Sequence, residues 1–122
     1  MLRARLIVEP DRSDRPEEFS AVALLGNEGD AATEIKPALI ESPSLALEIV
    51  DERGEPVLLP PPPVPGAAPE PVRLAPGEEY RARLSTFLPA WTAPGIYRAR
   101  LRYRPDGEAT VSDWAEFELA AP

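Results

Sequence analysis

The chain has 122 residues, of which 21 are acidic and 13 basic, with no histidine and no cysteine. This length suits a single domain, and the 43% of hydrophobic residues is enough for a core. The missing residue types exclude Ser-His-Asp and Cys-His catalysis, the usual zinc sites, haem, iron–sulfur clusters and disulfides, and the pI near 4.6 argues against general nucleic-acid binding.

The first half of the chain predicts short β-strands, because apolar residues alternate with polar ones or form short runs between turn residues. In the first strand, Leu2, Ala4, Leu6 and Val8 form the buried face. The run at 19–25 is apolar on both faces, which is typical of a central strand. The strands expected in this half are 2–9, 19–25, 33–35, 45–50 and, after a hairpin turn, 57–59.

Prolines dominate residues 60–71. Proline fixes φ and removes a hydrogen-bond donor, so this segment cannot join a sheet interior or a helix. We expect a stiff, extended crossover loop inside one domain that spans residues 1–122, because neither half has enough strands to close its own core. The spacing of Pro60 and Pro63 also matches ligands of proline-binding grooves, and in an inhibitor the segment would be a loop that faces a protease.

The second half predicts further strands at 72–74, 80–84, 96–104 and 113–119. No segment shows a helical period. The chain is therefore predicted to be all-β, an antiparallel β-sandwich of seven to eight strands without a disulfide. The predicted core residues are Val22, Leu24, Leu47, Ile49, Tyr80, Leu84, Tyr97, Leu101, Phe117 and Leu119.

Three turn and strand motifs stand out in this half: Pro-Gly-Glu at 76–78, Pro-Gly-Ile-Tyr at 94–97, and the terminal strand at 111–117. They resemble bacterial immunoglobulin-like domains. Tyr97 precedes Ala99 by two residues, where an immunoglobulin domain has its second cysteine, and this is the tyrosine-corner position. With the stretches 19–29 and 47–57, the layout is most similar to the bacterial intracellular proteinase inhibitor family, and also to a β-domain that precedes some secreted metallopeptidases.

Four arginines share the outward face of the predicted strand 96–104: Arg98, Arg100, Arg102 and Arg104. One interpretation is a basic stripe for an anionic partner, since the guanidinium group forms paired hydrogen bonds with carboxylates and phosphates. The other is pairing across strands with Glu116 and Glu118, because the last strand is expected beside this one. We favour the pairing, which leaves a surplus of arginines for a partner.

The loop 85–94 carries three large apolar residues, Phe87, Leu88 and Trp91, between prolines that stiffen it. A rigid apolar loop at the end of a sandwich can present a binding site. It can equally act as a plug that covers the open end of the core, and we favour the plug.

The acidic residues give no metal motif, because neither the loop 11–18 nor the turn 27–30 has the spacing of a calcium loop. We therefore expect solvated charge there, and we predict no metal and no cofactor. Glu78 and Glu79 are adjacent and point to opposite faces, and the sequence has no glycine-rich phosphate loop and no nucleophile elbow. These observations predict a protein that is not an enzyme.

No apolar run approaches the length of a membrane span, and the chain as given shows no signal peptide, so a cytoplasmic location is expected.

The expected function is a non-catalytic protein–protein interaction module. The resemblance implies an inhibitor or regulator of an intracellular protease. The alternatives are a structural or accessory β-domain of a larger assembly or beside a peptidase, and carbohydrate binding through Trp91 and Phe87. The partner is expected to be a protein, with no nucleic acid and no membrane. The chain is expected to be a monomer or a weak dimer that pairs through a bare first or last strand.

Overall fold

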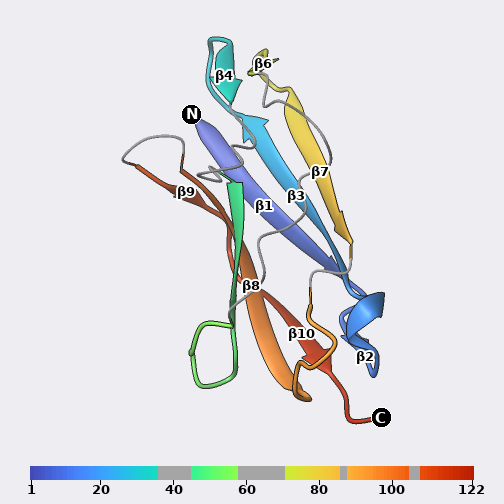
Figure 1. The fold of residues 1–122 in the computed structure, drawn as a ribbon. Helices are drawn as coiled ribbons and strands as arrows, with labels where there is room; N and C mark the ends of the chain where they lie inside the picture. The colour runs from blue at the N-terminus through green and yellow to red at the C-terminus, as the bar shows by residue number, and fades with distance from the viewer. Residues whose placement is uncertain (36–44, 58–70, 86–87, 105–107) are drawn as a thin grey trace.

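The computed structural model describes residues 1–35, 45–57, 71–85, 88–104 and 108–122, and these form an all-β structure (Figure 1). The helical content of this part is one 3-10 turn, η1 (Pro16–Glu18). The strands are β1 (Leu2–Glu9), β2 (Arg12–Ser13), β3 (Ser20–Asn27), β4 (Thr33–Ile35), β5 (Leu45–Val50), β6 (Val72–Leu74), β7 (Glu79–Ser85), β8 (Gly95–Tyr103), β9 (Thr110–Val111) and β10 (Ala115–Leu119).

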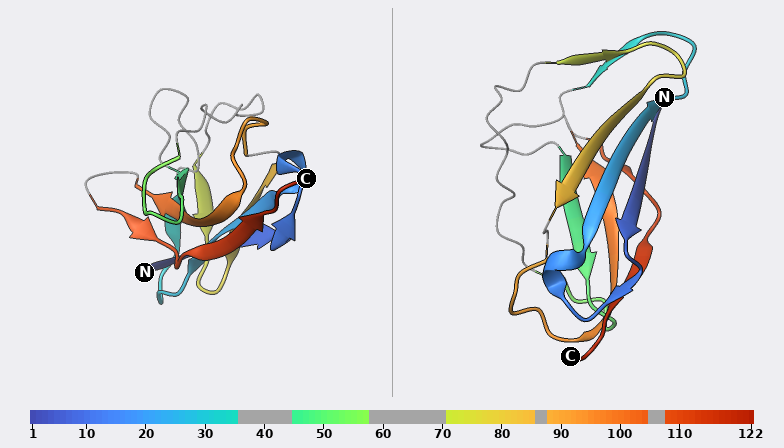
Figure 2. Two further views of the ribbon diagram at one scale, coloured as in Figure 1. Left: turned by 90° about the horizontal axis from the view of Figure 1, so that it is seen from below. Right: turned by 90° about the vertical axis from the view of Figure 1, so that its right-hand side faces the viewer.

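The strands form two larger sheets and one small one. One sheet has the order β1-β3-β7, and the other has the order β2-β10-β8-β5 with β9 added to β8. Neighbouring strands are antiparallel except for β2 and β10, which run parallel. The small sheet is the antiparallel pair of β4 and β6. The chain changes sheets between β1 and β2, where the Glu9–Pro10 peptide bond is cis. The two larger sheets lie as layers in the right-hand view of Figure 2.

The apolar side chains between the layers form two clusters. The first joins strands of both larger sheets with the β4–β6 pair and contains Ala4, Ala23, Leu25, Ile35, Leu74, Leu101 and Tyr103. The second lies at the other end of β8 and contains Phe19, Ile49, Leu88, Tyr97, Ala99, Phe117 and Leu119. In the second cluster the Phe117 ring lies between Phe19, at a centroid distance of 5.1 Å, and Tyr97, at 5.8 Å. Tyr97 and Phe117 lie on neighbouring strands of one sheet, and the contact with Phe19, which directly precedes β3, joins them to the other sheet.

The predicted all-β, antiparallel class is confirmed, and so are most strand positions. The predicted strands 2–9, 33–35, 45–50 and 72–74 coincide with β1, β4, β5 and β6, while the other main strands differ by one or two residues at their ends. The short strands β2 and β9 were not predicted. Pro56 forms a single bridge with Val50, and the predicted strand residues 58 and 59 lie outside the described residues. Residues 60–70 of the proline-rich segment also lie outside them.

Of the two core residues predicted on β3, Leu24 is buried as predicted, whereas the prediction for Val22 is wrong. Ala23 and Leu25 pack in the first cluster, whereas Val22 is half-buried and lies on the other face by strand alternation. Leu24 shares that outer face, where it is buried between Arg5 and Arg81, its register partners. The error has a physical reason: β3 is apolar on both faces, so alternation could not tell which face turns inward.

The other predicted core residues are either half-buried or fully buried, except for one whose side chain is not described. Tyr80 and Leu47 are half-buried and pack against the clusters, and the side chain of Leu84 lies outside the described part. The predicted core residues that are fully buried in the clusters are Ile49, Tyr97, Leu101, Phe117 and Leu119.

Asn27 closes the end of β3 with a buried side chain that is 2% exposed. Its Nδ2 donates to the carbonyls of Ala31 at 2.9 Å and of Leu74 at 3.0 Å, and its Oδ1 accepts from the backbone N–H of Gly29 at 2.9 Å. One side chain therefore joins the end of β3 to the following turn and to β6.

We expect Asn27→Ala to lower the free energy of unfolding by about 2 kcal/mol, because it leaves several backbone groups without their partner. Urea unfolding measures this value. Glu34→Ala, which truncates an exposed side chain on β4, serves as the control and should change it by less than about 0.5 kcal/mol. Equal stabilities of Asn27→Ala and the wild type would contradict the structural role of Asn27.

Candidate functional site

The arginine face of β8 is held mainly by Glu48 of the neighbouring strand β5. Glu48 lies 3.0 Å from Arg100 and 3.8 Å from Arg102. The Arg100 guanidinium also lies 4.5 Å from the ring centroid of Trp114, a cation–π contact. Two of the four arginines therefore share one carboxylate within the protein, which offsets one of their two positive charges.

The predicted acidic partners from the last strand are wrong. Glu116 lies opposite Arg98 in the register of β10 and β8, but no ion pair joins them in the described structure. Glu118 instead pairs with Arg12 of β2, at 3.4 Å. Strand β10 is beside β8 as predicted, but β5 lies on the other side of β8 and supplies the nearer carboxylate.

The four arginines do not form a continuous basic stripe. Arg98 and Arg104 are exposed, and neither has an ion pair within the described residues. They are six positions apart, about 20 Å along an extended strand. The paired Arg100 and Arg102 lie between them, so the two unpaired charges act as separate surface groups.

The loop 88–94 is attached firmly to the core at its start. Leu88 is 3% exposed and belongs to the second cluster, so Leu88 plugs this end of the core as the sequence predicts. The backbone N–H and the hydroxyl of Thr92 both donate to the carbonyl of Pro89, at 3.1 Å and 2.6 Å. These bonds close a tight turn around Trp91. Phe87, the third apolar residue predicted here, lies outside the described residues.

Trp91 does not take part in the plug, which corrects the sequence-based expectation for this residue. Its side chain is 80% exposed at the turn between Pro89 and Thr92. A turn of this kind holds the backbone fixed and directs the residue at its corner outward, so the indole covers no part of the core.

The loop is attached at its other end by Tyr97. The ring of Tyr97 is 6% exposed and stacks near Phe117, and its hydroxyl donates a hydrogen bond to the carbonyl of Ala93. A backward bond of this type is the defining contact of a tyrosine corner. With Leu88 at one end and Ala93 at the other, the exposed Trp91 projects from a loop with two fixed ends.

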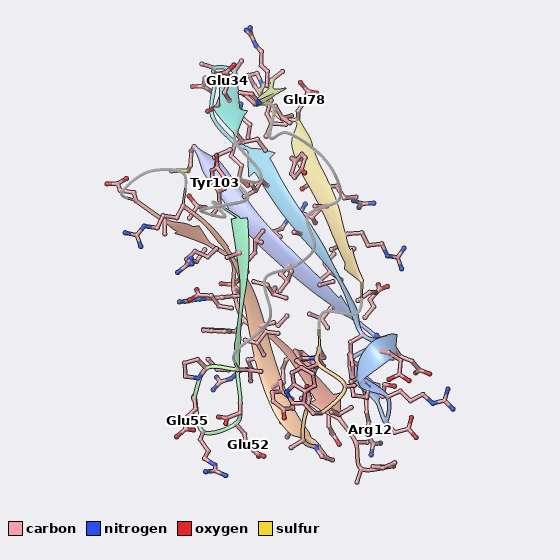
Figure 3. All side chains as sticks on the ribbon, in the orientation of Figure 1. Arg12, Glu34, Glu52, Glu55, Glu78 and Tyr103 are labelled. Atoms are coloured by element: carbon pink, nitrogen blue, oxygen red, sulfur yellow. The ribbon has the colours of Figure 1, made fainter. Side chains whose placement is uncertain are left out.

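An acidic hairpin lies at the same end of the molecule, where Figure 3 labels Glu52 and Glu55. The Oδ1 atom of Asp51 accepts the backbone N–H groups of Arg53 at 2.9 Å and of Glu55 at 3.0 Å, which fixes the turn. A side chain at Gly95 would meet the Glu52 carboxylate, so this hairpin approaches the start of β8. The candidate site therefore combines an exposed indole with nearby carboxylates.

The described residues show no group of three or more His, Cys, Asp or Glu side chains placed to hold a metal ion. In the acidic loop 11–18, Glu18 accepts a hydrogen bond from the Ser13 hydroxyl at 2.7 Å. Within the described residues, no helix is long and apolar enough to cross a membrane.

In comparisons with known proteins, no family model and no curated protein matches the chain.

Two contacts of the β8 arginines were not predicted from the sequence. Glu48 was not paired with the arginines because nothing in the sequence places β5 beside β8, although Glu48 faces outward in a strand that was predicted. The second involves Trp114, which is 40% exposed and whose contact with Arg100 the sequence does not predict. An outward aromatic residue near an arginine strand is the signal that could have found it.

Tyr97 gives a testable dependence of stability on pH. Its pKa is raised above the ordinary value of 10.0, first by burial and then by the carboxylates of Asp51 and Glu52. Because the pKa is higher in the folded chain than in the unfolded one, the stabilising contribution is complete below pH about 10 and is lost as the pH rises through the folded value. We expect the free energy of unfolding to fall more steeply there in the wild type than in Tyr97→Phe.

Urea unfolding of both proteins over that pH range measures the difference. At neutral pH the variant should be less stable by about 1 kcal/mol, because the bond to Ala93 is lost. Parallel pH profiles of the two proteins would contradict the account of Tyr97.

Two substitutions in the loop should separate its anchor from its exposed tip. Leu88→Ala should lower the free energy of unfolding by about 2–5 kcal/mol, as for other buried leucines. Trp91→Ala should change it by less than about 0.5 kcal/mol, because an indole that is 80% exposed supports little of the fold. Thermal unfolding in the same buffer provides the comparison, and a large loss of stability in Trp91→Ala would show that the indole is packed.

Proposed function

We propose that the protein is a non-catalytic protein–protein interaction module that binds its partner through the loop 88–94. The observation that carries this proposal is the 80% exposed Trp91 on a loop fixed by Leu88 and by the Tyr97–Ala93 bond. Tryptophan is among the residues most enriched at the energetic centres of interfaces. A fixed loop also loses little conformational entropy on binding, which favours affinity.

The proposal includes an immunoglobulin-like fold for the sandwich. Three observations support it: the sheets β1-β3-β7 and β2-β10-β8-β5, the parallel pair of β2 with β10, and the hydroxyl bond of Tyr97 near the start of β8. Loops at the ends of such sandwiches commonly form binding sites, and the loop 88–94 lies at one end (Figure 1).

In its sharper form, the proposed activity is inhibition or regulation of an intracellular protease in the cytoplasm. The support is the resemblance carried by the motifs at 76–78, 94–97 and 111–117. The loop chemistry agrees with it, because Pro89, Pro94 and the bonds of Thr92 stiffen a segment that a protease would otherwise accommodate as substrate. The acidic hairpin 51–57 favours a partner with basic groups around its binding surface.

The second candidate function is a structural or accessory β-domain of a larger assembly, and the open edge of strand β1 favours it. Carbohydrate binding has less support. Sugar rings are held by stacking on aromatic faces, and Trp91 is the aromatic residue that the described part of this loop offers.

The test is capture on immobilised protein, comparing the wild type with Trp91→Ala and with Trp114→Phe as a matched change of the other tryptophan. We expect the wild type and Trp114→Phe to retain a protease from lysate of the source organism. Trp91→Ala should bind it at least ~30-fold more weakly, as expected for an anchor worth about 2 kcal/mol.

The same three proteins are then added to the captured protease, and to purified serine, cysteine and metal-dependent proteases. Inhibition by the wild type and by Trp114→Phe, with loss in Trp91→Ala, supports the inhibitor form. Equal capture by Trp91→Ala and the wild type would remove the loop as the binding site. If no protein is captured and no protease is inhibited, the proposal fails.

A further inference from the structure

Strand β1 has an open edge. It is the end strand of the order β1-β3-β7, and no described strand pairs with its other side. It has 8 residues, which makes it the longest edge strand in the described structure. Its inward side chains are all apolar, and the strand contains no proline and no inward-pointing charge, two features that commonly protect an edge from pairing.

A shallow groove of about 390 Å³ follows this edge, between β1 and the segment that joins β9 to β10. The right-hand view of Figure 2 shows that segment beside β1. Three large apolar side chains that line the groove are exposed: Ile7 by 44%, Val111 by 45% and Trp114 by 40%. Unpaired backbone groups flanked by apolar side chains fit an added β-strand.

The hydrogen-bonding phase of β1 is fixed by its first contact with β3. The N–H of Glu28 donates to the carbonyl of Met1 at 2.8 Å, so Met1 directs its backbone carbonyl toward β3. Successive residues of a strand alternate in this direction. The residues whose N–H and C=O groups face the open edge are therefore Leu2, Ala4, Leu6 and Val8.

We propose that a second copy of this chain occupies the open edge, with β1 pairing antiparallel to β1 about a two-fold axis at Leu6. Leu6 then forms a hydrogen-bonded pair with Leu6 of the second copy, and Ala4 pairs with Val8 in both directions, for ~6 backbone hydrogen bonds. Opposite residues share a face of the sheet, so Arg3 of each copy faces Glu9 of the other. The strand is thus complementary to itself in charge.

The side chains that would form these pairs are available. Arg3 has a side chain that is 63% exposed, with a distance of 3.5 Å to Glu28, which is a loose contact. Glu9 is exposed, and the described structure shows no ion pair for it. The two copies would also bring the apolar residues Val111 and Trp114 of each groove to the same side of the joined sheet.

Other registers of this antiparallel pairing are less favourable. An axis at Arg5 places two arginines opposite each other, and an axis at Ala4 places Arg3 opposite Arg5. An axis at Ile7 pairs Arg5 with Glu9, but Arg5 is already bonded to Glu79, and only ~4 backbone hydrogen bonds form within β1. Charge and hydrogen bonding together select the axis at Leu6.

The first test is the mass in solution, measured by sedimentation over a range of concentrations. We expect a dimer for the wild type, and dissociation constants at least ~10-fold higher for Arg3→Glu and for Glu9→Arg, which place like charges opposite each other. The double variant Arg3→Glu/Glu9→Arg should regain the wild-type dissociation constant, since it exchanges the two charges. Arg83→Glu is the control, because β7 is the opposite edge of the sheet, and it should leave the mass unchanged.

A wild type that remains monomeric at its highest soluble concentration would overturn the proposal, and so would a double variant that stays as weak as the single ones. Trp91→Ala should leave the mass unchanged, so this result is separate from the test of the binding loop. Circular dichroism of each variant checks that the fold is retained.

The second test fixes the register and uses the absence of cysteine in the chain. With the axis at Leu6, Arg5 and Ile7 of the two copies lie opposite each other in a pair that is not hydrogen-bonded, where the Cα atoms are about 4.5 Å apart. A mixture of Arg5→Cys and Ile7→Cys should therefore form the mixed disulfide on oxidation, and neither variant should cross-link with itself. Self-cross-linking of Ile7→Cys would place the axis at Ile7 and overturn the proposed register.

Discussion

The stacked rings of Tyr97 and Phe117, together with the hydroxyl bond from Tyr97 to Ala93, are the contacts on which the proposed site depends. The ring belongs to the core between the sheets, while the hydroxyl reaches the loop outside it. One residue thereby couples the packing of β8 against β10 to the position of the loop that carries Trp91. Burial and the adjacent carboxylates raise the pKa of that hydroxyl, so it remains a donor to a higher pH than an ordinary tyrosine would.

The strands could be predicted because their residues alternate. In β8, small and large apolar residues alternate with arginines, and the exposure follows that pattern residue by residue. The face of β3 could not be predicted, since Val22 and Leu24 are as apolar as Ala23 and Leu25. The partner of Arg100 could not be predicted either, because Glu48 is distant in sequence and alternation says nothing about which strands become neighbours. The exposure of Trp91 depends on the turn formed by Pro89 and Thr92, and a hydrophobicity pattern does not describe such a turn.

Although the net charge is acidic, positive and negative groups are distributed differently over the surface. The arginines at the centre of β8 are held by Glu48, and Arg5 on β1 is held by Glu79, so these charges contribute to cohesion of the sheets. Exposed carboxylates lie beside the loop of Trp91, on the hairpin 51–57. The edge of β1 instead carries both signs, with Arg3 near one end and Glu9 at the other. The two surfaces thus suit different partners: a protein with basic groups at the loop, and a second copy at the edge.

The central claim is that Trp91 is exposed on a rigid loop before any partner binds. The direct measurement is the fluorescence of Trp114→Phe, in which Trp91 is the remaining tryptophan of the two. The account predicts emission typical of an indole in water, ready quenching by acrylamide, and an anisotropy decay that follows the tumbling of the whole molecule. Blue-shifted emission that resists quenching would show that Trp91 is buried, and a fast local loss of anisotropy would show that the loop is not fixed. Either result would contradict the account.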